Sequence, residues 1–212
     1  MPESAAQIAI RLAQFTGSER VLLITPGRHG EGILNCLLHE WPHAAKAQCV
    51  VFDASPERLN AAQATAPEKT RLLQGRATRL PFKRHSFDAI LSFEALYAIR
   101  PPWTVLAEFH RVLIPSGKFI LFEPARHGFF STLRDKITGP GKRIFALDEI
   151  KQRLVRCDYE LQQIEEVANV AGMNWPAYCV RAIKLHNAIE PPPEFTTARE
   201  MMEKRAKKIT NP

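Results

Sequence analysis

The sequence has 212 residues, a length that fits one domain with a sizeable hydrophobic core. Its hydrophobic fraction of 45% is ordinary for a globular protein, and no run approaches the roughly 18 apolar residues that a membrane span needs. The net charge of +7 favours acidic partners, but no basic motif interleaved with aromatic residues indicates nucleic acid, so we do not expect a nucleic-acid partner.

The four cysteines are scattered and include no CxxC pair. Such spacing argues against a zinc site and against a disulfide framework. The N-terminal residues lack the apolar centre of a secretory signal. We therefore expect a protein without a metal site in a reducing, cytoplasmic setting.

The first predicted element is an amphipathic helix over residues 3–16, which we expect at the entrance of the first strand. Residues 1–190 read as one domain. Beyond three consecutive prolines, residues 191–212 read as a polar C-terminal tail that includes a peripheral helix at 196–208.

A strand–turn–helix–strand unit follows the first helix. Residues 21–24 form an apolar run of β type, and a glycine-punctuated turn occupies residues 27–32. A helical apolar period covers residues 33–41, and a second β run over 49–52 ends on Asp53. This order is typical of the first half of a nucleotide-binding α/β fold.

The chemistry of this unit favours a nucleoside ligand. Glycine allows close approach of the backbone to a ligand, and a helix N-terminus presents free N–H groups. Asp53 lies 23 positions after Gly30, and an acid there can accept hydrogen bonds from two ribose hydroxyls. We expect a ligand at the carboxyl ends of the first two strands, touching Gly27 and Asp53. An ordinary turn with helix-start glycines is the alternative.

The rest of the chain alternates between predicted strands and helices, with Ser55 as the N-cap of the helix after Asp53. Residues 124–143 are rich in glycine, proline and charge, and we interpret them as a loop or cap over the ligand mouth. The predicted helices are 56–66, 102–113 and one around 147–154, and the predicted strands are 71–74, 86–93, 119–122, 160–167 and 177–184.

Three stretches, VVFDASPERL, LPFKRHSFDAILSFEALYAI and LAEFHRVLIPSGKFILFEP, resemble the class I S-adenosylmethionine (SAM)-dependent methyltransferases. The nearest subtype is the small-molecule group that includes the ubiquinone/menaquinone-biosynthesis C-methyltransferases, and the resemblance covers residues 18–184. It implies an α/β, Rossmann-like, doubly wound sheet of seven mostly parallel strands with helices on both faces. The last strand is expected to be antiparallel and inserted beside the fifth.

The resemblance also implies the cofactor-binding residues and places them at the ends of the first strands and after the third and fourth. General-base candidates are His127 and Tyr97, and no catalytic residue is assigned. We interpret His110 as structural. The implied cofactor-binding residues are Thr25, Pro26, Gly27, Gly30, Asp53, Ala54, Arg76, Ala77, Thr78 and Phe93.

The cofactor motif departs from the family pattern at four positions. Leu23 and Arg76 stand where the family usually has acids, and Thr25 and His29 stand where it usually or often has glycine. Each lost charged hydrogen bond costs roughly 1.5–3 kcal/mol, so we expect SAM to bind in the high micromolar range or worse. Glu31 or Glu94 could instead reach the ammonium of SAM. Arg76 is either an anion-binding residue that faces the pocket or a solvated one.

The resulting hypothesis is a SAM-dependent methyltransferase that acts on a small-molecule acceptor by direct transfer. The alternative is a methyltransferase-like protein that has lost SAM binding and serves as a partner subunit or binds another ligand. A protein partner or a homo-oligomer is compatible with both.

Overall fold

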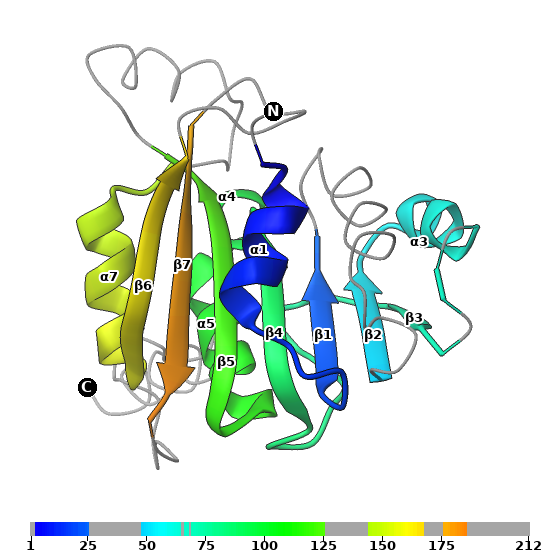
Figure 1. Ribbon diagram of the computed structural model, residues 1–212. Coiled ribbons are helices and arrows are strands. Elements are labelled where there is room, and N and C mark those ends of the chain that lie inside the picture. The colour runs from blue at the N-terminus through cyan, green and yellow to red at the C-terminus, as the bar shows by residue number, and fades with distance from the viewer. Residues whose placement is uncertain are drawn as a thin grey trace, which may run out of the picture.

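The computed structural model describes residues 3–25, 48–64, 66–67, 69–125, 144–167 and 176–185. Their centre is a seven-stranded sheet in the order β3-β2-β1-β4-β5-β7-β6, in which β7 runs antiparallel to the other six strands (Figure 1). The predicted fold class and the antiparallel strand beside the fifth are thus confirmed. The strands are β1 Arg20–Ile24, β2 Gln48–Asp53, β3 Arg71–Gln74, β4 Phe87–Phe93, β5 Leu113–Pro124, β6 Tyr159–Val167 and β7 Ala177–Lys184.

Helices cover both faces of this sheet, as Figure 1 shows. The apolar residues of α1 and α3 pack with one face, and those of α4, α5 and α7 pack with the other. The described helices are α1 Ala5–Ala13, α3 Pro56–Gln63, α4 Ala95–Ala98, α5 Pro102–Val112 and α7 Leu147–Arg156. Among the helices of these described ranges, none is long and apolar enough to cross a membrane.

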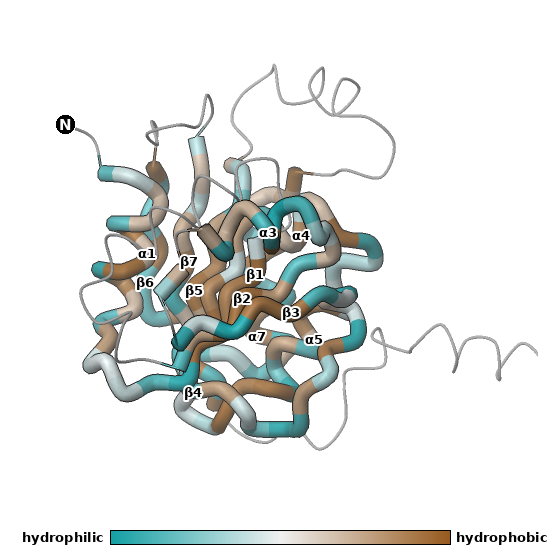
Figure 2. The backbone as a smooth tube through the Cα atoms, turned by 90° about the vertical axis from the view of Figure 1, so that its right-hand side faces the viewer, coloured by the Kyte–Doolittle hydropathy of each residue, from teal (hydrophilic) through white to brown (hydrophobic). Residues whose placement is uncertain are grey.

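The alternation of side chains along β1 explains this two-sided core. Val21 and Leu23 contribute to the cluster under α1, whereas Leu22 and Ile24 contribute to the cluster under α5. All four side chains are buried, as expected for a central parallel strand that is covered on both faces. Figure 2 shows hydrophobic residues running through the centre of the sheet.

Two expectations about element positions were wrong. Helix α1, capped by Ser4, lies against the face of the sheet with β5 and β7 and not at the entrance of β1. Strand β5 begins at Leu113, because that residue already pairs with Phe87 of β4 before a register irregularity. The strand was expected only over residues 119–122, and Ser116, with φ at 59°, is an irregular point inside β5.

Several expectations lie outside the described residues, namely the helix over 33–41, most of the cap over 124–143 and the C-terminal tail. The sequence also missed α4, a four-residue helix directly after β4. The remaining predicted strands and helices are confirmed to within a few residues at their ends.

An ion pair on α5 holds the segment that leads from β3 to β4. The guanidinium of Arg111 donates to the carbonyls of Phe82 and Leu80 at 2.7 and 2.9 Å. It also pairs with Glu108 at 2.7 Å, and Glu108 accepts from the backbone N–H of Leu80 at 2.6 Å. This arrangement fixes the Leu-Pro-Phe segment against α5, because the N–H and carbonyl of Leu80 and the carbonyl of Phe82 are satisfied by one ion pair.

We expect the Arg111→Met substitution to lower the free energy of unfolding by about 2–3 kcal/mol, because it leaves Glu108 and two carbonyls without their charged partner. Urea denaturation measures this change. The matched control is Arg11→Met: Arg11 pairs with two carboxylates where Arg111 pairs with one, but its side chain is 45% exposed against 25% for Arg111. The control should cost less than about 1 kcal/mol. Equal costs for both substitutions would contradict the role of the ion pair.

A buried histidine, His110, lies on α5 next to the first residue of β5. The sequence predicted a structural role for it. The His110 ring lies edge-on to Tyr159 at 5.4 Å, and the ammonium of Lys184 donates to the carbonyls of His110 and Leu113, each at 2.8 Å. Burial, assisted by the charge of Lys184, lowers the pKa of His110 from 6.5 to about 4, whereas Asp158 opposes this shift.

Because the folded-state pKa is depressed, the unfolded chain binds a proton at His110 between pH 6.5 and 4 and the folded chain does not. Lowering the pH from 7 to 5 should therefore cost up to about 2 kcal/mol of stability through this group. The His110→Phe variant should lose less stability than the wild type over the same interval in urea denaturation. An unchanged pH dependence in the variant would refute this assignment.

Candidate functional site

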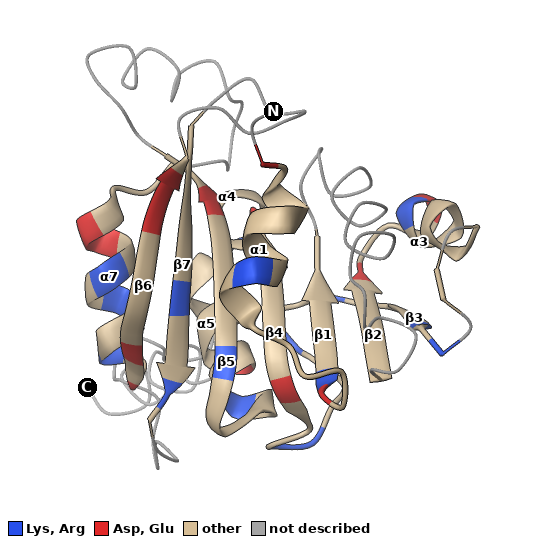
Figure 3. Ribbon diagram, in the orientation of Figure 1, with Lys and Arg blue, Asp and Glu red and all other residues tan. Residues whose placement is uncertain are grey.

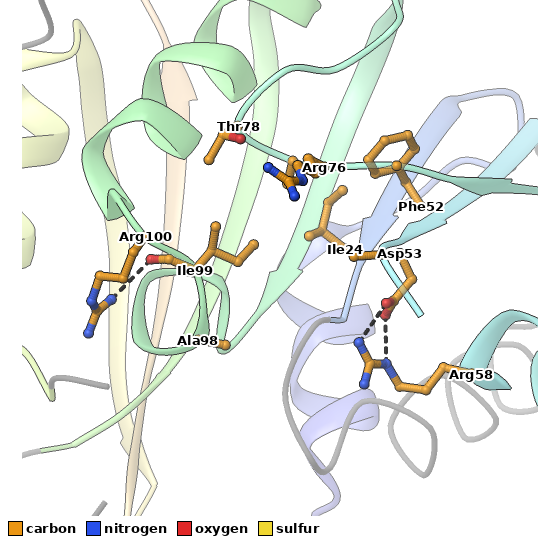
Figure 4. Close-up of a pocket in the computed structure, with 12 residues that line it drawn as sticks. Ile24, Phe52, Asp53, Arg58, Arg76, Thr78, Ala98, Ile99 and Arg100 are labelled. Atoms are coloured by element: carbon orange, nitrogen blue, oxygen red, sulfur yellow. Dashed lines mark hydrogen bonds and ion pairs between the residues drawn. The ribbon is translucent and has the colours of Figure 1, made fainter. Parts of the chain in front are cut away.

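A cavity of about 350 Å³ opens at the carboxyl ends of β1, β2 and β3, next to the segment that follows β4 (Figure 4). In open parallel sheets, ligands bind at this edge, at the point where the strand order reverses. Here that point is β1, which has β2 on one side and β4 on the other. The described lining residues are Ile24, Phe52, Asp53, Ala54, Arg58, Gly75, Arg76, Ala77, Thr78, Ala98, Ile99 and Arg100.

Five residues of the predicted cofactor site line this cavity: Asp53, Ala54, Arg76, Ala77 and Thr78. Asp53 stands at the carboxyl end of β2, as predicted. Figure 3 shows red acidic segments at the carboxyl ends of β2 and β5.

Two other predicted site residues are not part of the described lining. Thr25 is buried just after β1, and its neighbour Ile24 lines the cavity instead. Phe93 packs against Phe122 in the cluster under α1, with ring centroids 5.6 Å apart. Pro26, Gly27 and Gly30, like the candidate base His127, lie outside the described residues.

Asp53 already has strong partners. Its Oδ2 accepts from Nε of Arg58 at 2.9 Å, and its Oδ1 accepts from Nη2 of Arg58 at 2.6 Å and from the backbone N–H of Ser55 at 2.7 Å. The carboxylate is 4% exposed. Because a carboxylate offers about four acceptor positions, this arrangement leaves about one for a ligand.

Local sequence explains why Arg58 reaches Asp53. Ser55 caps α3 by accepting from the backbone N–H of Arg58, and Pro56 begins the helix. Arg58 therefore lies in the first turn, close to the strand end that carries Asp53. Sequence reasoning missed Arg58, although an Asp and an Arg five positions apart across a capped strand–helix turn would have indicated the pair.

The wall after β3 depends on a glycine. The backbone N–H of Gly75 donates to the carbonyl of Asp53 at 2.9 Å, which draws the segment close to Phe52. A Cβ at Gly75 would lie 2.5 Å from Cζ of the Phe52 ring. Any side chain at this position would therefore displace the aromatic ring that lines the cavity.

The wall after β4 depends on a buried carboxylate at the end of β5. Glu123 accepts from the backbone N–H groups of Leu96 and Tyr97 at 2.8 and 3.0 Å, at the start of α4. Burial raises the pKa of Glu123 to about 8, and the two backbone donors oppose this rise. These bonds place the end of α4 at the cavity, where Ile99 and Arg100 contribute to the lining.

The described lining of the cavity is basic. It contains three arginines, Arg58, Arg76 and Arg100, and one acid, Asp53, which is bound to Arg58. Arg100 donates to the carbonyls of Leu96 and Ile99. Arg76 is exposed, and its side chain forms no hydrogen bond or ion pair with any of the residues that the structure describes.

Residues 29–121 match a family model that is described as a methyltransferase domain. No curated protein gives a significant match. Among solved structures, a SAM-dependent methyltransferase from Mesorhizobium loti is 18% identical, with a TM-score of 0.66 over 85% of this chain and 98% of that chain. This chain has the same fold as that methyltransferase.

Two further structures have the same fold. The Burkholderia thailandensis 1,6-didemethyltoxoflavin-N1-methyltransferase, with bound 1,6-didemethyltoxoflavin and S-adenosylhomocysteine, is 19% identical, with a TM-score of 0.63 over 87% of this chain and 80% of that chain. A chain from a complex that contains the Haloferax volcanii Trm112 methyltransferase activator is 18% identical, with a TM-score of 0.70 over 85% and 89%.

We expect Gly75→Ala to destabilise the protein by about 1–3 kcal/mol, because the new methyl group overlaps the Phe52 ring. Urea denaturation tests this in two backgrounds. In a Phe52→Leu background, which lacks the distal ring atoms, the same substitution should cost clearly less. Equal costs in both backgrounds would show that the glycine is required for another reason.

Proposed function

We propose that this protein is a SAM-dependent methyltransferase that acts on a small-molecule acceptor. The observation that carries the proposal is the cavity at the carboxyl ends of β1, β2 and β3, with Asp53 at its edge, in a chain that matches a methyltransferase-domain family over residues 29–121. A cavity of about 350 Å³ lies in the size range of small-molecule sites.

The described lining suits the adenosine part of SAM. Asp53 would accept a ribose hydroxyl at its remaining acceptor position, and Ile24, Phe52 and Ile99 provide apolar surface for the base. Its charge suits SAM less well, because SAM carries a sulfonium and an ammonium whereas the described lining has more arginines than acids. We therefore keep the expectation of weak binding.

Bound SAM would supply an activated methyl group, so the main tasks of the protein are to hold and align the two substrates. A base is needed only for an acceptor that loses a proton. Of the two candidates, Tyr97 lies on α4, where its backbone N–H is bound to Glu123 and its side chain is almost buried. The Tyr97 hydroxyl could act as the base only if the methyl acceptor bound next to α4.

Titration of the protein with SAM by calorimetry tests the proposal, with binding in the high micromolar range as the expected result. Asp53→Asn should weaken binding about tenfold, since it removes the charged acceptor of the ribose. The matched control is Asp88→Asn. Asp88 accepts from the guanidinium of Arg20 through both oxygens and from one backbone N–H, like Asp53, but lies at the amino-terminal end of β4.

The control should lose stability but keep the affinity for SAM. Equal loss of binding in both variants would show that the effect is general destabilisation. Absence of SAM binding by the wild-type chain would reject the enzyme and support the alternative of a methyltransferase-like partner subunit.

A further inference from the structure

We propose that the cavity also binds a ribonucleoside that carries a phosphate monoester, with Arg58 holding the phosphate and Arg76 adding to the attraction. The proposal deepens the proposed function and rests on it, because the nucleoside would occupy the position expected for the adenosine part of SAM. Such a ligand would compete with SAM and regulate access to the site.

The first argument is the remaining hydrogen-bonding capacity of Arg58. A guanidinium has five N–H donors in a planar fork, and Arg58 uses two of them for Asp53. Three donors remain, which suits an anion with several acceptor oxygens. The pair with Asp53 and the backbone bond to Ser55 already fix this arginine, so little conformational freedom is lost when it binds a ligand.

The second argument is the position of this arginine relative to a ribose. Asp53 keeps about one acceptor position, so it can receive one ribose hydroxyl. The guanidinium of Arg58 lies 2.6–2.9 Å from the same carboxylate, and a group on the neighbouring ribose oxygen would therefore meet it. In dinucleotide-binding sites of this topology, an acid at this place binds the ribose 2′-hydroxyl of NAD, and in NADP sites a nearby arginine accommodates the 2′-phosphate.

The third argument is the charge of the described lining. The described lining has a formal charge of +2, from three arginines and one aspartate. In the view of Figure 4, Ile24 lies between Arg76 and the pair formed by Asp53 and Arg58. Arg76 is exposed and forms no ion pair within the described part of the chain, so its charge is available to a ligand. A phosphate monoester carries close to two negative charges at neutral pH and matches this lining.

Competition titrations of the full chain test the proposal. The probes are adenosine, its 2′-, 3′- and 5′-monophosphates, and inorganic phosphate. We expect at least one monophosphate to bind about tenfold or more tightly than adenosine, since a charged hydrogen bond contributes that much. Affinities of adenosine and all three monophosphates within twofold of one another would overturn the proposal. So would inorganic phosphate binding as tightly as the best monophosphate.

Substitutions locate the effect. The preference is the affinity for the best monophosphate divided by the affinity for adenosine. Arg58→Met should bring this ratio close to one, and Arg58→Lys should keep part of it. Arg76→Gln should lower the ratio severalfold. The matched control is Arg20→Met, which removes the same kind of bidentate pair at the other end of the sheet and should leave the preference unchanged. If Arg58→Met folds, as urea denaturation shows, and keeps the full preference, the assignment is wrong. If Arg58→Met does not fold, the same result for Arg58→Lys overturns it.

The same titrations separate this inference from the proposed function. Binding of SAM without any preference for a monophosphate would reject the inference and leave the methyltransferase standing. A monophosphate preference that depends on Arg58, in a chain that does not bind SAM, would support the inference and reject the methyltransferase.

Discussion

The central strands β1 and β4 are covered on both faces, and this constraint decides where polar chemistry can occur. All the apolar side chains of these two strands are buried, in two clusters on opposite sides of the sheet. A charged group within the strands would lose its hydration without gaining a partner. At the carboxyl edge, charged groups stand at the strand ends: Asp53 at the end of β2, Glu94 directly after β4 and Glu123 near the end of β5. Because everything beneath this edge is buried, the edge is where we expect a ligand site.

At this edge, the carboxylates of Asp53 and Glu123 bind backbone N–H groups and thereby hold the start of a helix. Asp53 fixes the start of α3 through Ser55 and Arg58, and Glu123 fixes the start of α4 through two backbone N–H groups. The two helices on either side of the cavity thus depend on acids that stand on different strands. Because Asp53 serves both the fold and the proposed ligand, its pair with Arg58 links the stability of the site to its charge preference.

Much of this arrangement was predictable, because strand order and strand ends depend on patterns that are local in sequence. The apolar runs, the Ser55 cap and the acid at the end of β2 were sufficient to place Asp53 at this edge, and the resemblance to the methyltransferases placed the segment from Arg76 to Thr78 beside it. The contribution of Arg58 and the position of Phe93 were not predictable in this way. The contact of Arg58 with Asp53 depends on the side-chain rotamer of Arg58. The position of Phe93 depends on which face of the sheet that residue of the strand occupies.

Leu23 shows how the core limits the chemistry of the site. In the methyltransferases that the sequence resembles, an acid is usual at this position, whereas Leu23 is fully buried in the apolar cluster under α1, together with Val21 and Leu12. An aspartate at position 23 would be an unpaired charge in that cluster and would destabilise the protein. An acid at this position would therefore require repacking of α1. We expect the ligand preference of the proposed site to depend instead on the side chains that do reach the cavity, above all on the pair of Arg58 with Asp53.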